Sequence, residues 1–219
     1  MENEKAKFLI SELLKDPFKF AKQGMSDILL QEYFHGFEIE TLRPLLKSKN
    51  IYIQSAATYI VSELGRKANP LIDDIIPLLK SENLAIKYEA LESIMIGSIE
   101  QPSKFIYIIE ALDDADESIR LRAMELIMNS HPEQIKESIK YFEQKPDIQS
   151  KNHLICLDLY LQFSDVDPKR VTALIIDNNP LIRKYGAIIA KKVFEKFPYL
   201  TREASQSLDL DIYRFINEA

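Results

Sequence analysis

Three acidic side chains are the residues of this chain whose types and spacing first indicate chemistry. Glu92, Glu125 and Asp158 stand 33 residues apart. On stacked helices, carboxylates at a fixed interval would form a row with neighbours about 10 Å apart. Such a row favours a basic partner, because complementary charge steers association.

A histidine and a cysteine, His153 and Cys156, have the spacing that a base and a nucleophile on one helix would need. Cys156 also occupies the place of a small buried residue in the repeat described below, so we expect this thiol to pack rather than react. The chain has no second cysteine. This excludes an internal disulfide bond and a zinc site built from several thiolates.

The other titratable residues indicate structural roles. No two histidines have the i, i+4 spacing of a helical zinc pair, and no HExxH, P-loop, GxGxxG or GxSxG motif is present. Two adjacent carboxylate pairs suit a helix start and a turn better than acid–base catalysis: Asp73 with Asp74, and Asp113 with Asp114. We therefore expect no catalytic residue, no metal and no cofactor.

The elements that would position these residues form a repeat of 33 residues. Ala57, Ala90 and Ala123 are in register, as are Ile53, Ile86 and Ile119, and Leu46, Leu79 and Leu112. A period of this length is typical of stacked arrays in which each unit packs on its neighbours. Each unit is expected to be a helical hairpin. In the second repeat the two helices would span about 70–80, with Asn69 as the N-cap, and about 84–96. Small residues would let adjacent helices approach closely: Ala57, Ala90, Ala123, Cys156 and Gly186.

One face of the second helices is predicted to carry a partner-binding surface. We call Ile53, Ile86 and Ile119, which recur at the 33-residue period, the register isoleucines. Positions two and six residues after a register isoleucine point away from the core. They place aromatic and aliphatic side chains beside the row of carboxylates. The alternative is that curvature buries part of this face and leaves only a solvated acidic surface. The predicted surface consists of Tyr59, Tyr88, Glu92, Leu121, Glu125, Leu154 and Asp158.

The segments IKYEA (86–90), IRLRA (119–123) and IRKYG (182–186), after polar or acidic turns, resemble HEAT or HEAT-like repeats of the armadillo type. The resemblance covers about residues 40–194. It implies an all-α fold, a right-handed α-solenoid of about five to six HEAT-like helical hairpins, with the second helices on the concave face. It also implies that Lys87, Arg120 and Arg183 tie neighbouring turns together through acids such as Asp114, Asp116 or Asp177. The tetratricopeptide and ankyrin patterns are absent.

Composition fits a folded globular protein, with 46% apolar and 28% charged residues. We expect a single domain over 1–219, with an N-terminal cap (1–36), repeats (37–194) and a C-terminal cap (195–219). No apolar run approaches the roughly 18–20 residues that cross a bilayer, and the N-terminus lacks a signal-peptide pattern, so a cytoplasmic protein is expected. The formal net charge of −6 makes nucleic-acid binding an unfavoured function.

These observations predict a non-enzymatic, monomeric scaffold that captures another protein, one with a basic surface, on its concave face. An inhibitor or a toxin-neutralising immunity protein is a concrete version. The alternative is a HEAT-like DNA glycosylase of the alkylation-repair type, but the chain has no Trp. A basic group near the C-terminus could contact phosphates, although we expect it to be a solvated face: Lys169, Arg170, Arg183, Lys184, Lys191, Lys192 and Lys196.

Overall fold

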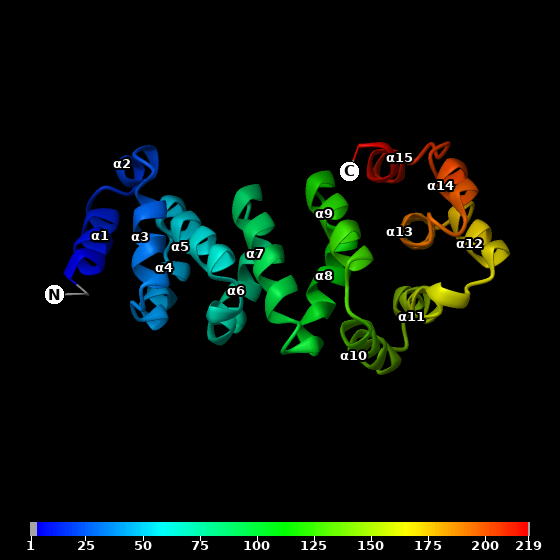
Figure 1. The fold of residues 1–219 in the computed structure, drawn as a ribbon, viewed down its shortest axis with the longest axis horizontal. Coiled ribbons are helices and arrows are strands. Elements are labelled where there is room, and N and C mark those ends of the chain that lie inside the picture. The colour runs from blue at the N-terminus through cyan, green and yellow to red at the C-terminus, as the bar shows by residue number, and fades with distance from the viewer. Residues whose placement is uncertain (1–3, 219) are drawn as a thin grey trace. The chain divides into compact units, whose positions relative to one another are not determined.

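The computed structural model describes residues 4–218, and over this range all regular structure is helical, with no strand. Figure 1 shows helix after helix along the chain. The described residues divide into two compact units, with the boundary between Gly97 and Ser98. The predicted all-α fold of repeated helical hairpins is confirmed. The division into caps and repeats within one domain stays a prediction.

The first unit begins with three helices, α1 (Glu4–Lys15), α2 (Pro17–Lys22) and α3 (Met25–Phe34). A hairpin of η1 (Ile39–Leu42), α4 (Arg43–Leu46) and α5 (Ile51–Leu64) follows. The unit ends with η2 (Gly65–Leu71), α6 (Ile72–Ile75), η3 (Ile76–Lys80) and α7 (Leu84–Gly97). Helix α5 packs between α3 and α7.

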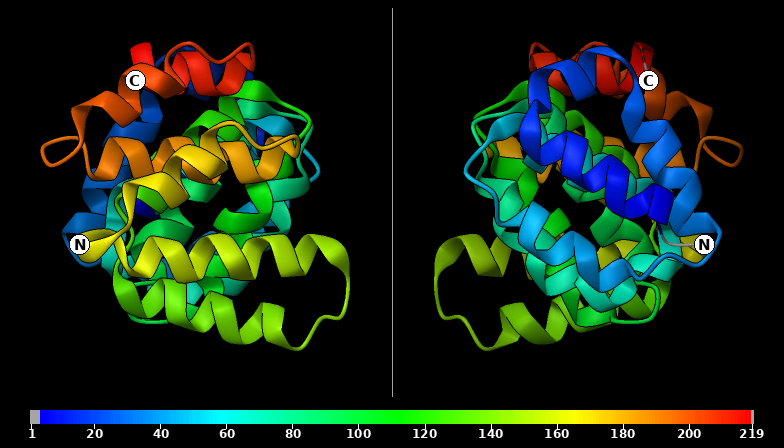
Figure 2. Two further views of the ribbon diagram at one scale, coloured as in Figure 1. Left: turned by 90° about the vertical axis from the view of Figure 1, so that its right-hand side faces the viewer. Right: turned by 90° about the vertical axis from the view of Figure 1, so that its left-hand side faces the viewer.

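The second unit starts with η4 (Pro102–Phe105), α8 (Ile106–Glu110), η5 (Ala111–Asp113) and α9 (Glu117–Met128). The pair α10 (Pro132–Glu143) and α11 (Ile148–Leu161) lies side by side, drawn yellow-green in Figure 2. After η6 (Phe163–Asp165) come α12 (Pro168–Ile175), α13 (Pro180–Lys192), α14 (Pro198–Ala204) and α15 (Leu210–Asn217).

The second helix of each hairpin is continuous, while several first helices are broken. The predicted helix over about 70–80 is wrong in this respect, because it consists of η2, α6 and η3. Pro70 lies inside η2 and Pro77 near the start of η3, and a proline has no N–H to donate to the preceding turn. Asn69 therefore lies within η2 and does not cap a helix.

The second helices begin at capping side chains that share the 33-residue period. Asn50 accepts from the backbone N–H of Tyr52, and Asp116 accepts from that of Ser118. The Asn83 side chain accepts from the Ile86 N–H in the same way. Each cap satisfies an N–H group that the helix leaves without a carbonyl partner, which fixes where the helix starts.

The small residues predicted for the helix seams are all buried: Ala57, Ala90, Ala123, Cys156 and Gly186. Gly186 shows the physical reason most clearly. A Cβ atom at this position would lie 2.7 Å from the Ile175 backbone nitrogen and 2.9 Å from the Leu174 carbonyl carbon. The backbones of α12 and α13 thus approach more closely than any other side chain allows.

The arginines that follow the register isoleucine hold turns together, as the HEAT-like resemblance implied, but through different atoms. Arg120 Nη1 donates to the carbonyl oxygens of Asp114 and Ala115, and Arg183 Nη1 does the same to those of Asp177 and Asn178. Asp114 and Asp177 thus take part in these bonds through their backbone carbonyls, and the charge of Asp116 acts on Arg120. The carboxylates come from the C-terminal region: Asp211 for Arg120 and Asp209 for Arg183.

A buried ionic group joins α15 to α9 and α13. The Asp211 carboxylate lies 2.6 Å from Arg120 Nε and 3.3 Å from Lys184 Nζ, and all three side chains are mostly buried. Burial by itself raises the pKa of Asp211, but the hydrogen bonds and charges of Arg120 and Lys184 outweigh it and lower the pKa below its ordinary value. At the edge of the same contact, Arg214 pairs with Glu117 at 2.7 Å.

We expect Gly186→Ala to destabilise the protein by about 1–3 kcal/mol, because the added methyl group would collide with the backbone of α12. An exposed Gly-to-Ala change inside a helix would instead stabilise by roughly 0.5–1 kcal/mol. Urea unfolding measures the difference. Gly97→Ala is the control, since its nearest neighbour is the movable end of Ile72, and it should cost less.

Replacing Asp211 by Asn should lower the free energy of unfolding by about 3–5 kcal/mol, because Arg120 and Lys184 would lose the carboxylate between them. The more exposed pair offers a comparison: Glu117→Gln, which removes the ion pair with Arg214, should cost about 1 kcal/mol or less. Equal effects of both substitutions in chemical denaturation would contradict this account.

Candidate protein-binding surface

The predicted surface residues are divided between the two units. Tyr59 on α5 and Tyr88 and Glu92 on α7 belong to the first unit. The second unit contains Leu121 and Glu125 on α9, and Leu154 and Asp158 on α11. None of the seven is fully buried: Tyr88 and Asp158 are exposed and the others are half-buried. Each group is therefore described in its own unit.

In the first unit, Tyr59 connects the predicted surface to helix α3. Its hydroxyl donates a hydrogen bond to the Asp27 carboxylate, at 2.6 Å. This bond, with burial and the negative charges of Asp27, Glu63 and Glu89 adding to it, raises the pKa of Tyr59 to about 12. The hydroxyl thus remains protonated and fixes Tyr59 against α3.

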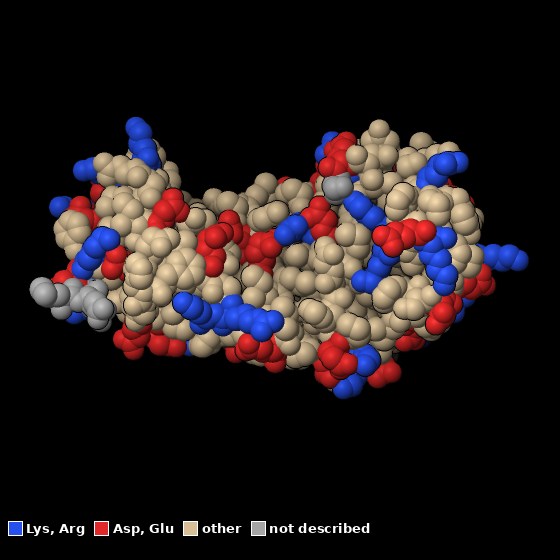
Figure 3. Space-filling model, viewed as in Figure 1, with Lys and Arg blue, Asp and Glu red and all other residues tan. Residues whose placement is uncertain are grey.

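Carboxylates on α5 and α7 lie close enough to influence one another. Burial raises the pKa of Glu89, and the charges of Glu63 and Glu92 raise it further, although a hydrogen bond from Ser62 opposes the shift. We call Asp27, Glu63, Glu89 and Glu92 the acidic cluster. Figure 3 shows acidic side chains gathered over α5 and α7.

The repeat pattern identified Glu92 but missed the other members of the acidic cluster. Glu89 lies three residues after its register isoleucine and Glu63 lies ten after Ile53. At about 100° per residue, both positions fall on the same side of a helix, next to the predicted face. This was the available signal. Asp27 belongs to the N-terminal helices, which lack the repeat, so no register could have indicated it.

The predicted acids of the second unit have different surroundings. Glu125 forms an ion pair with Arg122, at 2.5 Å, and its charge also acts on Lys191. Its negative charge is therefore largely balanced within the unit. Asp158 is exposed, while Leu121 and Leu154 are half-buried.

On α13 the helix face that the repeat pattern predicts to point outward is buried. Lys184 and Ile188 hold the positions that are predicted to point outward in every repeat, yet Lys184 is 5% exposed and Ile188 is fully buried. Lys184 Nζ donates to the Leu112 carbonyl and pairs with Asp211. The face is covered because α13 also packs against α9. On α13 this face is therefore packed against other helices, as the alternative interpretation expected, and is not an open surface.

The basic group near the C-terminus is not the solvated face that was expected. Lys192 donates to the Met128 carbonyl, Lys191 to that of Phe215 and Lys196 to that of Ser164. Arg183 and Lys184 are paired with Asp209 and Asp211. Most of these cations therefore connect helices within the second unit.

The His153 and Cys156 spacing does not produce a reactive thiol. Cys156 is buried, and burial together with the charge of Asp177 raises its pKa to about 12, so the thiol stays protonated. His153 is stacked on Phe142, with ring centroids 4.3 Å apart, and its Nδ1 shares a 2.8 Å hydrogen bond with the Tyr185 hydroxyl. Both residues pack in the core of the second unit.

Over residues 4–218, no group of three or more histidine, cysteine or acidic side chains has an arrangement suited to a metal ion. A search of the same residues for a helix with the length and apolar character of a membrane span finds none.

No protein-family model matches the chain, and no curated protein matches it either. Among solved structures, it is similar to an archaeal HEAT-like repeats protein from Thermococcus onnurineus NA1. The two are 13% identical, with 99% of this chain and 96% of that chain covered and a TM-score of 0.47. Two engineered proteins are also similar. One is 14% identical, covering 81% and 93% of the two chains with a TM-score of 0.42. The other is 13% identical, covering 87% and 59% with a TM-score of 0.45. At these identities the likeness concerns the fold alone.

Stability should depend on pH through His153. Burial lowers its pKa from 6.5 to about 4, so between these values the unfolded chain binds a proton that the folded protein does not. The contribution of His153 is complete above pH 6.5 and is lost as the pH falls toward 4. Against His153→Gln, which does not titrate, the stability difference should shrink by about 3 kcal/mol between pH 7 and pH 4. Parallel stability curves in urea unfolding would contradict the assignment.

Proposed function

We propose that this protein is a non-enzymatic scaffold that captures a partner protein with a basic surface, and that the acidic cluster of the first unit is the main contact. The observation that carries this proposal is that Glu63 on α5 and Glu92 on α7 lie close enough to Glu89 for their charges to act on it, in addition to burial, which is the main cause of its raised pKa. Helical repeats provide the rigid support, because each second helix is fixed by its cap and by its buried seam.

The electrostatic reason for a basic partner is repulsion among like charges. The carboxylates of Glu63, Glu89 and Glu92 on α5 and α7 repel one another, and an arriving lysine or arginine relieves that repulsion. Exposed Tyr88 and half-buried Tyr59 stand among them and offer aromatic faces to a cation. Residues of the second unit, Leu121, Glu125, Leu154 and Asp158, would extend the contact.

Masking a basic partner is the action of an inhibitor, and a toxin-neutralising immunity protein would be one case. A cytoplasmic location suits the single cysteine, which is a buried thiol. The alternative of a DNA glycosylase has less support. The chain has no Trp, and most of its C-terminal cations are bonded within the second unit.

We expect the double substitution Glu63→Lys with Glu92→Lys to abolish capture of the partner while leaving helicity unchanged. The charge-matched control is Glu82→Lys with Glu143→Lys, at two exposed acids outside the acidic cluster. Each Glu→Lys substitution changes the formal charge by about +2, so either pair of substitutions brings the formal net charge from −6 to −2. The readout is affinity purification from the source cells with the three proteins as baits, followed by direct binding of any protein that is retained.

The expected result is a protein with a basic surface that binds the wild type and the control but not the Glu63/Glu92 variant, with an affinity that falls steeply with salt. A retained protein that binds all three baits equally, or one whose contact surface is acidic, would refute the proposal.

A further inference from the structure

The second unit contains a pocket that the proposed partner surface does not use. It lies where η5 ends and where α11 and α13 begin, and it encloses about 570 Å³. This volume is in the range of small-molecule sites, roughly 300–1,000 Å³. The pocket is lined by Asp113, Ile148, Gln149, Asn152, Asn179, Pro180 and Leu181.

One lining residue, Asn152, breaks the repeat. It lies 33 residues after Ile119, at the position that a register isoleucine would occupy. The three register isoleucines are buried, whereas Asn152 is half-buried. No hydrogen bond joins its side chain to another residue in the range 4–218. The asparagine thus gives up apolar burial and gains no bond within the described part of the protein. A departure of this kind from a local pattern is expected at a binding site.

Two further amides line the pocket and are only partly used. Gln149 Nε2 donates to the Asp113 carboxylate, and no described residue donates to the Gln149 carbonyl oxygen. Asn179 Oδ1 caps α13 by accepting from the Leu181 N–H at 2.9 Å, and no described residue accepts from its NH₂ group. Together with the Asn152 amide, the pocket therefore offers uncharged donors and acceptors side by side.

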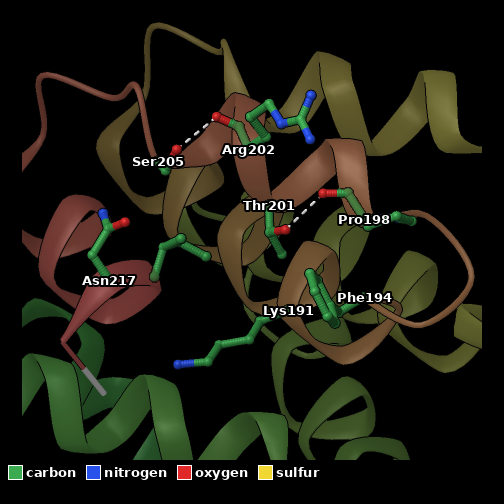
Figure 4. A pocket seen from close by; sticks show the side chains of 8 residues that line it. Lys191, Phe194, Pro198, Thr201, Arg202, Ser205 and Asn217 are labelled. Carbon is green, nitrogen blue, oxygen red and sulfur yellow. Dashed lines mark hydrogen bonds between the residues drawn. The ribbon is translucent and has the colours of Figure 1, made fainter.

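The pocket of Figure 4, between α13, α14 and α15, differs in this respect. It encloses about 540 Å³, but its polar groups are used within the protein. The Thr201 hydroxyl donates to the Pro198 carbonyl, and the Ser205 hydroxyl donates to the Arg202 carbonyl (Figure 4). The Lys191 ammonium donates to a backbone carbonyl of α15. Because bonded groups gain less from a ligand than free ones do, the pocket at Asn152 is the better candidate for a site.

The other lining residues of the pocket at Asn152 suit an uncharged ligand. Of the seven described residues that line it, Asp113 alone carries a charge, and the chain has a net charge of −6. A carboxylate repels anions and accepts hydrogen bonds from hydroxyl groups. Ile148 is 78% exposed and Pro180 is also exposed, so both can offer apolar surface. A neutral ring with hydroxyl groups at its edge and C–H groups on its face matches both properties.

We propose that this pocket binds a neutral saccharide. A sugar hydroxyl both donates and accepts, so it can pair with the amides of Gln149, Asn152 and Asn179. The Asp113 carboxylate accepts from a further hydroxyl, and the C–H face of a sugar ring packs on Ile148.

The test is a heteronuclear NMR titration of the isotope-labelled full chain with glucose, maltose and cellobiose, and with glucuronate as the anionic counterpart of glucose. At least one disaccharide should give saturable shifts with a Kd of about 1–10 mM. The shifted backbone amides should lie at the starts of α11 and α13. Glucuronate should shift them less than glucose does, because Asp113 repels its carboxylate.

Three results would overturn the proposal. One is the absence of saturable shifts with any neutral sugar up to about 50 mM, well above the expected Kd. Another is a set of shifts that lies only outside the pocket. The third is a glucuronate effect as large as that of glucose.

Two variants locate the site. Asn152→Ile should fold, because it restores the residue type of the other repeats, and it should weaken binding by about threefold or more, the loss of one neutral hydrogen bond. Gln149→Leu should have a similar effect. The matched control is Gln31→Leu, which removes an exposed amide from α3 outside the pocket and should leave affinity unchanged.

Circular dichroism checks the fold of each variant. Since Gln149 is exposed, Gln149→Leu tests the site even if Asn152→Ile disturbs the packing. Unchanged affinity in a folded Asn152→Ile or Gln149→Leu protein would refute the assignment.

Discussion

Close approach between the two helices of a hairpin is the constraint on which the rest of the structure depends. It requires a small residue at the centre of each second helix, and Gly186 shows how narrow the space is, because a Cβ there would meet the backbone of α12. The seams bury the register residues and fix the rotation of the second helices. That rotation decides which side chains face outward, and therefore where charge lies on the surface.

Polar side chains complete what the seams begin. Asn and Asp caps start the second helices, and Arg120 and Arg183 hold the preceding turns by donating to two carbonyls each. In the second unit these same arginines reach Asp211 and Asp209, so that the C-terminal helix packs against α9. At this contact the buried Asp211 carboxylate accepts two hydrogen bonds from Arg120, which makes the packing specific.

The two units use charge in different ways. In the first unit, the Asp27 carboxylate on α3 accepts from Tyr59 on α5, and the charges of Glu63 and Glu92 act on Glu89. In the second unit, Arg122 balances Glu125, and Lys184 and Lys192 bond to carbonyls inside the unit. One sequence period thus leads to an acidic face in one unit and to internal bonds in the other, because the helices that surround each position differ.

The sequence by itself determined the helical repeat, the small residues of the seams and the second helices, since these follow from local periodicity and helix-capping chemistry. It also indicated Tyr59 and Glu92 through their register. Only the tertiary structure decided that Asp27, Glu63 and Glu89 join them, that Lys184 is buried against α9, and that Arg120 is paired with a carboxylate 91 residues away. These contacts join positions without a common register, and their formation depends on how the helices pack, which local periodicity does not encode.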